Sequence, residues 1–155
     1  MKKKFIAGIM ITCIFTLAGC GKITYPDLPD DAIVFETGEY MDKNDDDALY
    51  GTLEYEGRTY MPYGTIGESI KEEDIDACIG YILQTEDNSS VADASNTDFR
   101  IYTLTEDPEH NYLMDYYIGD TLMNQPYFWR AVDTKGEDIN TPPYISSYEY
   151  AYWEE

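Results

Sequence analysis

The feature that most constrains the fold is a succession of short runs rich in aromatic and β-branched residues. Three of them follow one another closely in the chain: Phe99–Leu104, 112–118 and 127–132. Turn-forming residues occupy the connections between the runs: Asp107-Pro108 in the first, and Gly119-Asp120 and Asn124-Gln125-Pro126 in the second. Strands joined by turns, with no crossover helix between them, pair antiparallel. The sequence therefore predicts an antiparallel meander at the centre of the domain.

A β-hairpin is predicted before this meander. The runs Leu49–Tyr55 and 58–61 flank the dipeptide Glu56-Gly57, in which glycine readily adopts the positive φ that a two-residue turn requires. We expect Pro62 and Gly64 to end the second strand, because proline cannot donate a ladder hydrogen bond and glycine weakens strands.

Residues 69–84 predict one short helix followed by a strand. Ser69-Ile70-Lys71-Glu72 has the capping-box pattern of a helix N-terminus, and two further acids follow it. Apolar residues recur at helical spacing beyond this point, but Gly80 and its β-prone neighbours disfavour a long helix. We therefore expect a helix over residues 70–77 and a strand over residues 78–84.

These elements predict a single α+β domain over residues 48–155, mainly an antiparallel β meander with one short helix. Residues 86–97 have Val91 as their one sizeable apolar side chain and predict a loop. The aromatic tail, residues 144–153, is compatible with a strand or a short helix. Residues 32–35 could add an edge strand, and the pattern leaves that open.

The N-terminus has the features of a secretory signal. Lys2, Lys3 and Lys4 precede an uncharged run over residues 5–17, which as a helix would span only ~20 Å. That length is short of the ~30 Å hydrocarbon core of a bilayer, so we expect a cleaved signal peptide over residues 1–19 rather than a transmembrane helix.

The end of this signal, Leu17-Ala18-Gly19-Cys20, resembles the lipobox of bacterial lipoproteins. The resemblance implies cleavage before Cys20, acylation of the Cys20 thiol (a diacylglyceryl group, with palmitate-type chains), and a cell-membrane location facing outside the cytoplasm. The alternative is an ordinary signal peptide with a cysteine at this position by chance. The resemblance covers the first 20 residues only, so the remaining chain has to be interpreted on its own.

Acidic residues dominate the rest of the chain. Without the three signal lysines it carries 7 basic and 31 acidic residues, a net charge of −24. Such a charge repels nucleic acid and anionic lipid surfaces, so we expect no nucleic-acid partner and membrane contact only through the lipid. Residues 20–47 are rich in acids and contain Pro26 and Pro29, which predicts a lipidated, extended acidic tether.

Enzyme and metal signatures are weak. The sequence has no HExxH, CxxC, P-loop or GxGxxG motif, and its one histidine, His110, lies in a turn. Asp42-Lys43-Asn44-Asp45-Asp46-Asp47 resembles the front of a calcium loop, but Asp47 stands where that loop needs glycine. Cys78, between apolar neighbours, is interpreted as a core residue. We predict no catalytic residue, no metal site and no cofactor.

The arginines form the most suggestive pattern in the folded part. Arg58, Arg100 and Arg130 are the only three, each lies in a predicted strand, and each has aromatic neighbours, among them Tyr102, Phe128 and Trp129. Arginine can hold a carboxylate with its fork or stack on an aromatic ring. These six residues are therefore the candidate contacts for an anionic ligand or a partner's carboxylate. The alternative is three separate cross-strand pairs with local acids.

The function expected from the sequence is that of a membrane-anchored, extracytoplasmic lipoprotein that binds a protein partner without catalysis. A glycan-binding lipoprotein is the first alternative, and a carboxylate-dependent hydrolase is the second. A protein binder should expose a patch of aromatics, a glycan binder a groove with stacked rings, and a hydrolase paired carboxylates in a cleft.

Overall fold

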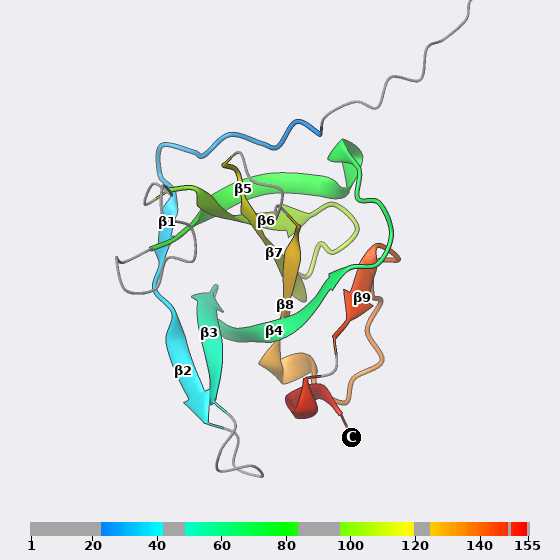
Figure 1. The fold of residues 1–155 in the computed structure, drawn as a ribbon. Coiled ribbons are helices and arrows are strands. Elements are labelled where there is room, and N and C mark those ends of the chain that lie inside the picture. Colours follow the sequence, from blue (N-terminus) through cyan, green and yellow to red (C-terminus); the bar gives the residue numbers. More distant parts are fainter. Residues whose placement is uncertain (1–22, 42–48, 84–96, 120–124, 149, 155) are drawn as a thin grey trace, which may run out of the picture.

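The computed structural model describes residues 23–41, 49–83, 97–119, 125–148 and 150–154. The lipobox with Cys20, the acidic stretch 42–47 and most of the expected loop over residues 86–97 lie outside the described residues. Within them the structure is mostly β-sheet, and nine strands form one curled sheet (Figure 1).

The predicted meander is confirmed. β5 (Ile75–Ile82), β6 (Phe99–Leu104), β7 (Tyr112–Tyr117) and β8 (Tyr127–Ala131) pair antiparallel in succession. Because directly opposed residues share a face, the register sorts these strands into two faces. One face carries Tyr102, Met114 and Phe128, and the other carries Ile101 and Leu113.

The predicted hairpin is also confirmed, but its second strand is longer than expected. β3 (Leu49–Tyr55) and β4 (Arg58–Ile66) flank the turn, where Glu56 and Gly57 both have positive φ, 50° and 77°. β4 continues past Pro62 because its other edge pairs with β8, and the register shifts between Pro62 and Gly64. Pro62 and Gly64, which were expected to end the strand, lie at this irregularity, and the strand continues beyond them.

The helix predicted over residues 70–77 is wrong. The structure has a single 3₁₀ turn, η1 (Glu72–Asp74), and β5 begins directly after it at Ile75. The capping role falls to Asp74, whose carboxylate accepts a hydrogen bond from the Lys71 backbone N–H at 2.7 Å, and not to Ser69. Pairing of β5 with β6 outweighs the local helical signal, so the α component of the fold class is reduced to short turns among the described residues.

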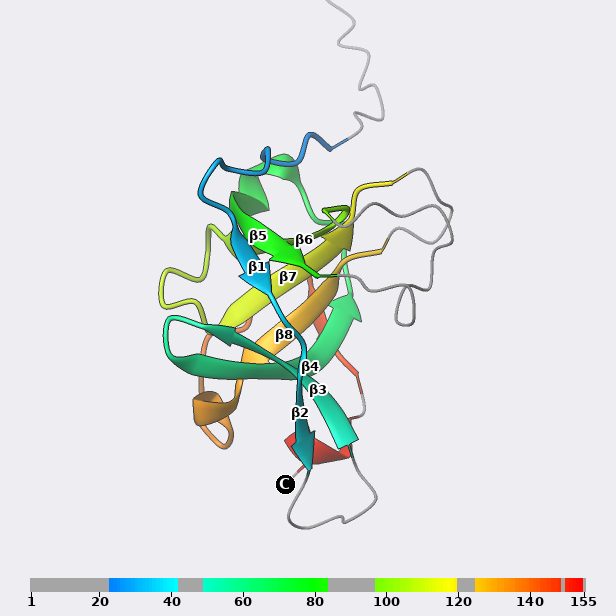
Figure 2. The same cartoon turned by 90° about the vertical axis from the view of Figure 1, so that its left-hand side faces the viewer.

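The segment that was expected to be a tether instead packs against the domain from residue 23 to residue 41. β1 (Ile33–Phe35) pairs parallel with β5, and β2 (Gly38–Met41) pairs antiparallel with β3. Phe35 is 2% exposed in the core. β5 and β3 are distant in the strand order, so this one extended segment brings the two ends of the sheet together (Figures 1 and 2).

The core has two parts, one on each face of the curled sheet. The interior cluster takes one side chain from each of seven strands, β1 and β3 to β8: Phe35, Leu53, Tyr60, Ile82, Ile101, Leu113 and Ala131. The outer cluster centres on Tyr102, Tyr112, Met114 and Phe128, and Ile23, Tyr25 and Leu28 of the N-terminal segment pack over it.

The aromatic tail forms both of the elements that the sequence left open. β9 (Ile145–Ser147) pairs with the distal half of β4, and η3 (Ala151–Trp153) follows it. β3 pairs with β4 only over Arg58–Tyr60, so β3 and β9 share the same edge of β4 one after the other. The tail runs across the gap that separates them, where the Trp153 indole N–H donates to the Pro62 carbonyl and the Tyr152 backbone N–H to the Tyr50 hydroxyl.

Gly80 allows β1 to approach β5. A Cβ at position 80 would collide with the backbone carbonyl of Ile33. We predict that Gly80→Ala displaces β1, exposes Phe35 and lowers the free energy of unfolding by about 2 kcal/mol, measured by denaturant unfolding. Gly51→Ala is the control, because its Cβ would make only an ordinary contact with the Trp129 ring at 3.9 Å. Equal effects of the two substitutions would contradict the proposed role of Gly80.

Candidate functional site

The structure places Arg100 and Arg130 on one face of the meander but does not bring them together. Arg100 lies opposite Tyr116 in β7, and Arg130 lies opposite Tyr112 at the other end of the same strand. Between them Tyr102 and Phe128 fill the outer core and are 0% and 1% exposed. Neither of these two rings is available to a partner, and Trp129 points to the opposite face of the sheet, against the interior cluster.

Arg58 joins three separate parts of the fold. Its guanidinium pairs with both oxygens of Asp133 in η2 (Val132–Thr134), at 2.7 Å from Nη2 and 3.0 Å from Nε. It also donates to the carbonyls of Glu109 and His110 and to the Asn111 side chain. The hydrogen bond and charge of Arg58 lower the pKa of Asp133, in agreement with a formed ion pair. All three guanidinium nitrogens of Arg58 therefore donate hydrogen bonds to groups of this chain rather than to a ligand.

Arg130 is enclosed by aromatic rings. Its guanidinium carbon lies 5.1 Å from the Trp153 ring centroid and 5.3 Å from that of Tyr63. Its nitrogens donate to the Thr134 hydroxyl at 2.8 Å and to the Thr134 carbonyl at 2.7 Å. Cation–π contacts and charge-assisted hydrogen bonds of this kind stabilise the docking of the tail. Arg100 donates to the Thr97 carbonyl at 3.4 Å, a long contact.

Four tyrosine side chains, two exposed and two half-buried, gather where the tail crosses the split between β3 and β9. The rings of Tyr148 and Tyr150 are 5.4 Å apart, and those of Tyr50 and Tyr150 are 6.5 Å apart. Burial raises the pKa of Tyr150, and the charges of Tyr127 and Tyr148 add to this shift. Tyr127 therefore lies close enough to Tyr150 to interact with it electrostatically. We call Tyr50, Tyr127, Tyr148 and Tyr150 the tyrosine surface.

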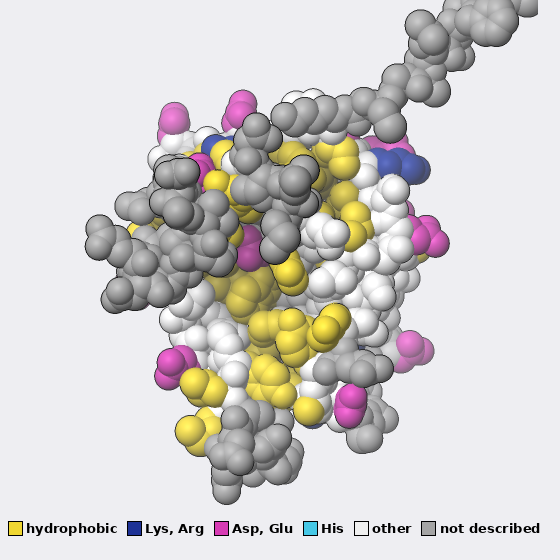
Figure 3. Space-filling model, in the orientation of Figure 1, with side chains coloured by type: hydrophobic (Ala, Val, Ile, Leu, Met, Phe, Trp, Pro, Cys, Tyr) yellow, Lys and Arg dark blue, Asp and Glu magenta, His cyan; other side chains and the backbone are white. Residues whose placement is uncertain are grey.

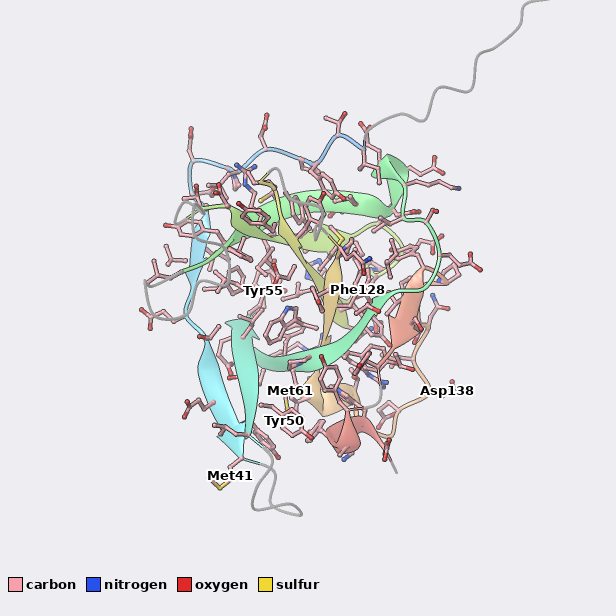
Figure 4. All side chains as sticks on the ribbon, viewed as in Figure 1. Met41, Tyr50, Tyr55, Met61, Phe128 and Asp138 are labelled. Atoms are coloured by element: carbon pink, nitrogen blue, oxygen red, sulfur yellow. The ribbon has the colours of Figure 1, made fainter. Side chains whose placement is uncertain are left out.

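The tyrosine surface is accessible from outside. Tyr148 is 61% exposed and Tyr127 is 52% exposed. Figure 3 shows hydrophobic side chains grouped at the centre of this face, over β3, β4 and the tail, with acidic side chains mostly around its periphery. Met41 and Leu49, which pair with each other at the end of the β2–β3 ladder, are also more than half exposed. Figure 4 shows Met41 and Tyr50 in the same lower part of the molecule.

An acid in the meander was not singled out by the sequence analysis. Asp115 lies in β7 on the interior face, with Ile101 opposite it on one side and Tyr127 on the other. The residue as a whole keeps some solvent contact, but its Oδ1 is fully enclosed and has no hydrogen-bond partner. Burial raises the pKa of Asp115 to about 7, and the neighbouring Trp129 side chain partly opposes this shift. The one signal was a charged residue within the otherwise uncharged run 112–118.

Other candidate groups have structural roles. Cys78 is a buried free thiol, and burial raises its pKa, as expected for an unreactive core cysteine. His110 has a positive φ of 51° and its Nδ1 lies 3.2 Å from Glu56, which links the β6–β7 connection to the hairpin turn. Within the part of the chain that the structure describes, no group of three or more metal-ligating acids, histidines or cysteines occurs.

The enclosed carboxyl of Asp115 has a consequence for stability. A raised carboxyl pKa means that the folded protein disfavours the ionised form, so stability is lost as pH rises from about 4 through 7. We predict that Asp115→Asn raises the free energy of unfolding at pH 8 by about 2 kcal/mol, less than the full pKa shift implies because some solvent reaches the residue. Denaturant unfolding at pH 8 and pH 5 measures the effect, which should shrink at pH 5.

The exposed Asp138 provides the control, since Asp138→Asn removes the same charge at the periphery (Figure 4). An Asp115→Asn protein that is less stable than the wild type at pH 8 would contradict this description of the site.

Comparison with known proteins adds no further identification. The chain matches no protein-family model, no curated protein and no solved structure. None of the helices in the described residues has the length and apolar character needed to cross a membrane. Arguments about function therefore rest on the residues of this chain alone.

Proposed function

We propose that the protein is a lipid-anchored, extracytoplasmic binding module whose tyrosine surface docks a protein partner that presents a basic face. The observation that carries this proposal is the exposed aromatic group at Tyr127 and Tyr148. Tyrosine supplies a large contact area with few rotatable bonds, which makes it one of the residues most enriched at the centres of protein interfaces.

The orientation of the rings favours a protein over a glycan. Tyr50 and Tyr150 meet at 76°, and Tyr148 and Tyr150 meet at 51°. Rings at such angles to one another form an uneven surface, which suits the side chains of a protein partner. A sugar instead stacks its face on the flat, accessible face of an aromatic ring. A glycan is the second candidate ligand, and the binding experiment below distinguishes it.

The charge of the chain indicates the chemistry of the partner. With 31 acidic residues against 10 basic ones, the protein attracts cationic surfaces and repels anionic ones. Lysine and arginine side chains of a partner could pair with acids at the periphery and stack on the tyrosine rings. Association should then be fast at low salt and slower as ionic strength rises.

The position of the anchor fits this display. The segment over residues 23–32, which follows the predicted lipid-bearing Cys20 closely in the sequence, lies at one end of the domain, whereas the end of β2 and the C-terminal tail lie at the opposite end (Figures 1 and 2). A lipid on Cys20 would therefore hold that first end toward the membrane. Tyr50 and the tail would then face away from it, where a partner can reach them.

A carboxylate-dependent hydrolase receives little support. Such an enzyme needs a second carboxylate close to the acid whose pKa is raised. The interior positions nearest to Asp115 on the neighbouring strands β6 and β8 carry Ile101, Phe99, Tyr127 and Trp129.

The anchoring part of the proposal is tested by Cys20→Ala. The substitution removes the thiol that would carry the lipid, so the protein should leave the detergent phase on phase separation and lose labelling by a radioactive fatty acid. Cys78→Ala is the matched control, because Cys78 is buried in the fold. Fatty-acid labelling that persists in the Cys20→Ala protein would contradict lipidation at this site.

The binding part is tested by Tyr127→Ala and Tyr148→Ala in the full-length, detergent-solubilised protein. Each substitution should weaken retention of a partner from envelope extract about tenfold, the effect of removing a side chain at the centre of an interface. Both should leave thermal unfolding nearly unchanged, because the two rings are more than half exposed. Retention should also weaken between 50 and 300 mM salt.

Val34→Ala is the control for this experiment, since Val34 is 47% exposed on β1 and belongs to no part of the tyrosine surface. Equal losses in all three variants would contradict the proposal. Retention of polysaccharide rather than protein, lost in the tyrosine variants alone, would assign the surface to a glycan.

A further inference from the structure

Beside the tyrosine surface, two polar groups in the interior of the sheet lack partners. Asp115 Oδ1 and Trp129 Nε1 are both enclosed, and neither makes a hydrogen bond that satisfies normal geometry. The register explains their proximity: Asp115 lies opposite Tyr127, and Leu113 lies opposite Trp129, so Asp115 and Trp129 are diagonal neighbours on one face. Buried polar atoms without partners are uncommon in folded proteins, and a water, an ion or another group that supplies the missing partner is one explanation for them.

The surroundings of this pair are aromatic and uncharged. β6 contributes Phe99 and Ile101 to the same face, β7 contributes Tyr117, and β8 contributes Tyr127. The Phe99 and Tyr117 rings lie 4.8 Å apart. Of these neighbours only the two tyrosines are titratable, and no charged group is among the causes that shift the pKa of Asp115. Asp115 is thus an acid without a counter-ion among the described residues.

We infer that Asp115 and Trp129 form a recognition site for a single cationic group, an arginine guanidinium or a lysine ammonium supplied by the partner protein. The inference rests on the proposed function for the source of the cation. Tyr127 connects the two sites, because it belongs to the tyrosine surface and lies directly opposite Asp115. A partner that covers the tyrosine surface would thereby place a basic side chain within reach of Asp115.

The chemistry of the pair selects a cation over an anionic or neutral group. An ionised carboxylate only accepts hydrogen bonds, and a guanidinium or ammonium only donates them. The Trp129 indole N–H remains available to the other carboxylate oxygen, consistent with its opposing effect on the pKa of Asp115. The faces of Trp129, Tyr127 and Phe99 would stabilise the cation by cation–π attraction. The excess of acidic residues over the whole chain disfavours an anion at the same position.

The site is tested directly with N-acetyl-arginine amide as a probe of the full-length protein in detergent, without any partner. We expect saturable binding that quenches or shifts Trp129 fluorescence, with Trp153→Phe used to isolate that signal. The cation binds the ionised carboxylate, so affinity should rise with pH. For a pKa of about 7, the ionised fraction and therefore the affinity should increase about tenfold between pH 6 and pH 8.

The controls separate this site from general electrostatic attraction. N-acetyl-citrulline amide has nearly the same shape as the probe without its charge, and it should bind at least tenfold more weakly. Asp115→Asn should abolish the pH dependence and weaken binding to the level of the neutral compound, whereas Asp138→Asn should leave both unchanged. Thermal unfolding of each variant verifies that it is folded.

The inference would be overturned by failure of the probe to bind, by equal affinity for the neutral compound, by an unchanged affinity in Asp115→Asn, or by equal losses in Asp115→Asn and Asp138→Asn. Failure here is distinguishable from failure of the proposed function. Tyrosine variants that lose the partner while the probe fails to bind would preserve the docking surface and exclude the cation site. Probe binding, together with tyrosine variants that still retain the partner, would preserve the cation site and exclude the tyrosine surface as the docking surface.

Discussion

The constraint on which the structure depends is the passage of one extended segment between the two ends of the sheet. β1 adds to β5 in parallel, β2 adds to β3 antiparallel, and Phe35 enters the interior between them. An open sheet of these strands would leave the edges of β3 and β5 unpaired and the interior cluster exposed on one side. Because Gly80 has no side chain, the backbone of β1 can lie close enough to complete this arrangement. Curling in turn creates the interior in which Asp115 is enclosed.

A second consequence concerns the edge of β4. β3 leaves β4 early to pair with β2, so the later part of that edge is free to accept β9. The chain that follows β9 crosses the resulting split and is fixed there by the Trp153 hydrogen bond, by the contact of Arg130 with the Trp153 ring, and by the edge-on contact of Tyr152 with Trp153. Trp153, which holds the tail, and the exposed Tyr148 thus lie within one short segment of the chain. The tyrosine surface therefore exists because β3 and β9 separate along the edge of β4 and the tail crosses between them.

The sequence was informative where local chemistry and pairing agree. The hairpin at Glu56-Gly57 and the strand β6 were predicted because turn residues and β-prone residues point to the same structure. The helix over 70–77 was wrong because its apolar spacing also suits a strand, and only pairing with β6 decides between them. Strand β1 could not be placed, since its partners lie more than forty residues away. The six arginine-site candidates are not gathered in one place, because the strand register, which sequence periodicity does not give, puts Arg100 and Arg130 at opposite ends of β7.

The claim that most of the functional account depends on is that the tyrosine surface is covered by a protein with a basic face. Site-specific photo-cross-linking in intact cells measures this directly, with a photoreactive amino acid placed at position 148 or, for comparison, at position 34. The account predicts a cross-link from position 148 to one protein, at a lysine- or arginine-rich segment identified by mass spectrometry, and none from position 34. Cross-links of equal yield from both positions, or a partner joined through an acidic segment, would contradict it.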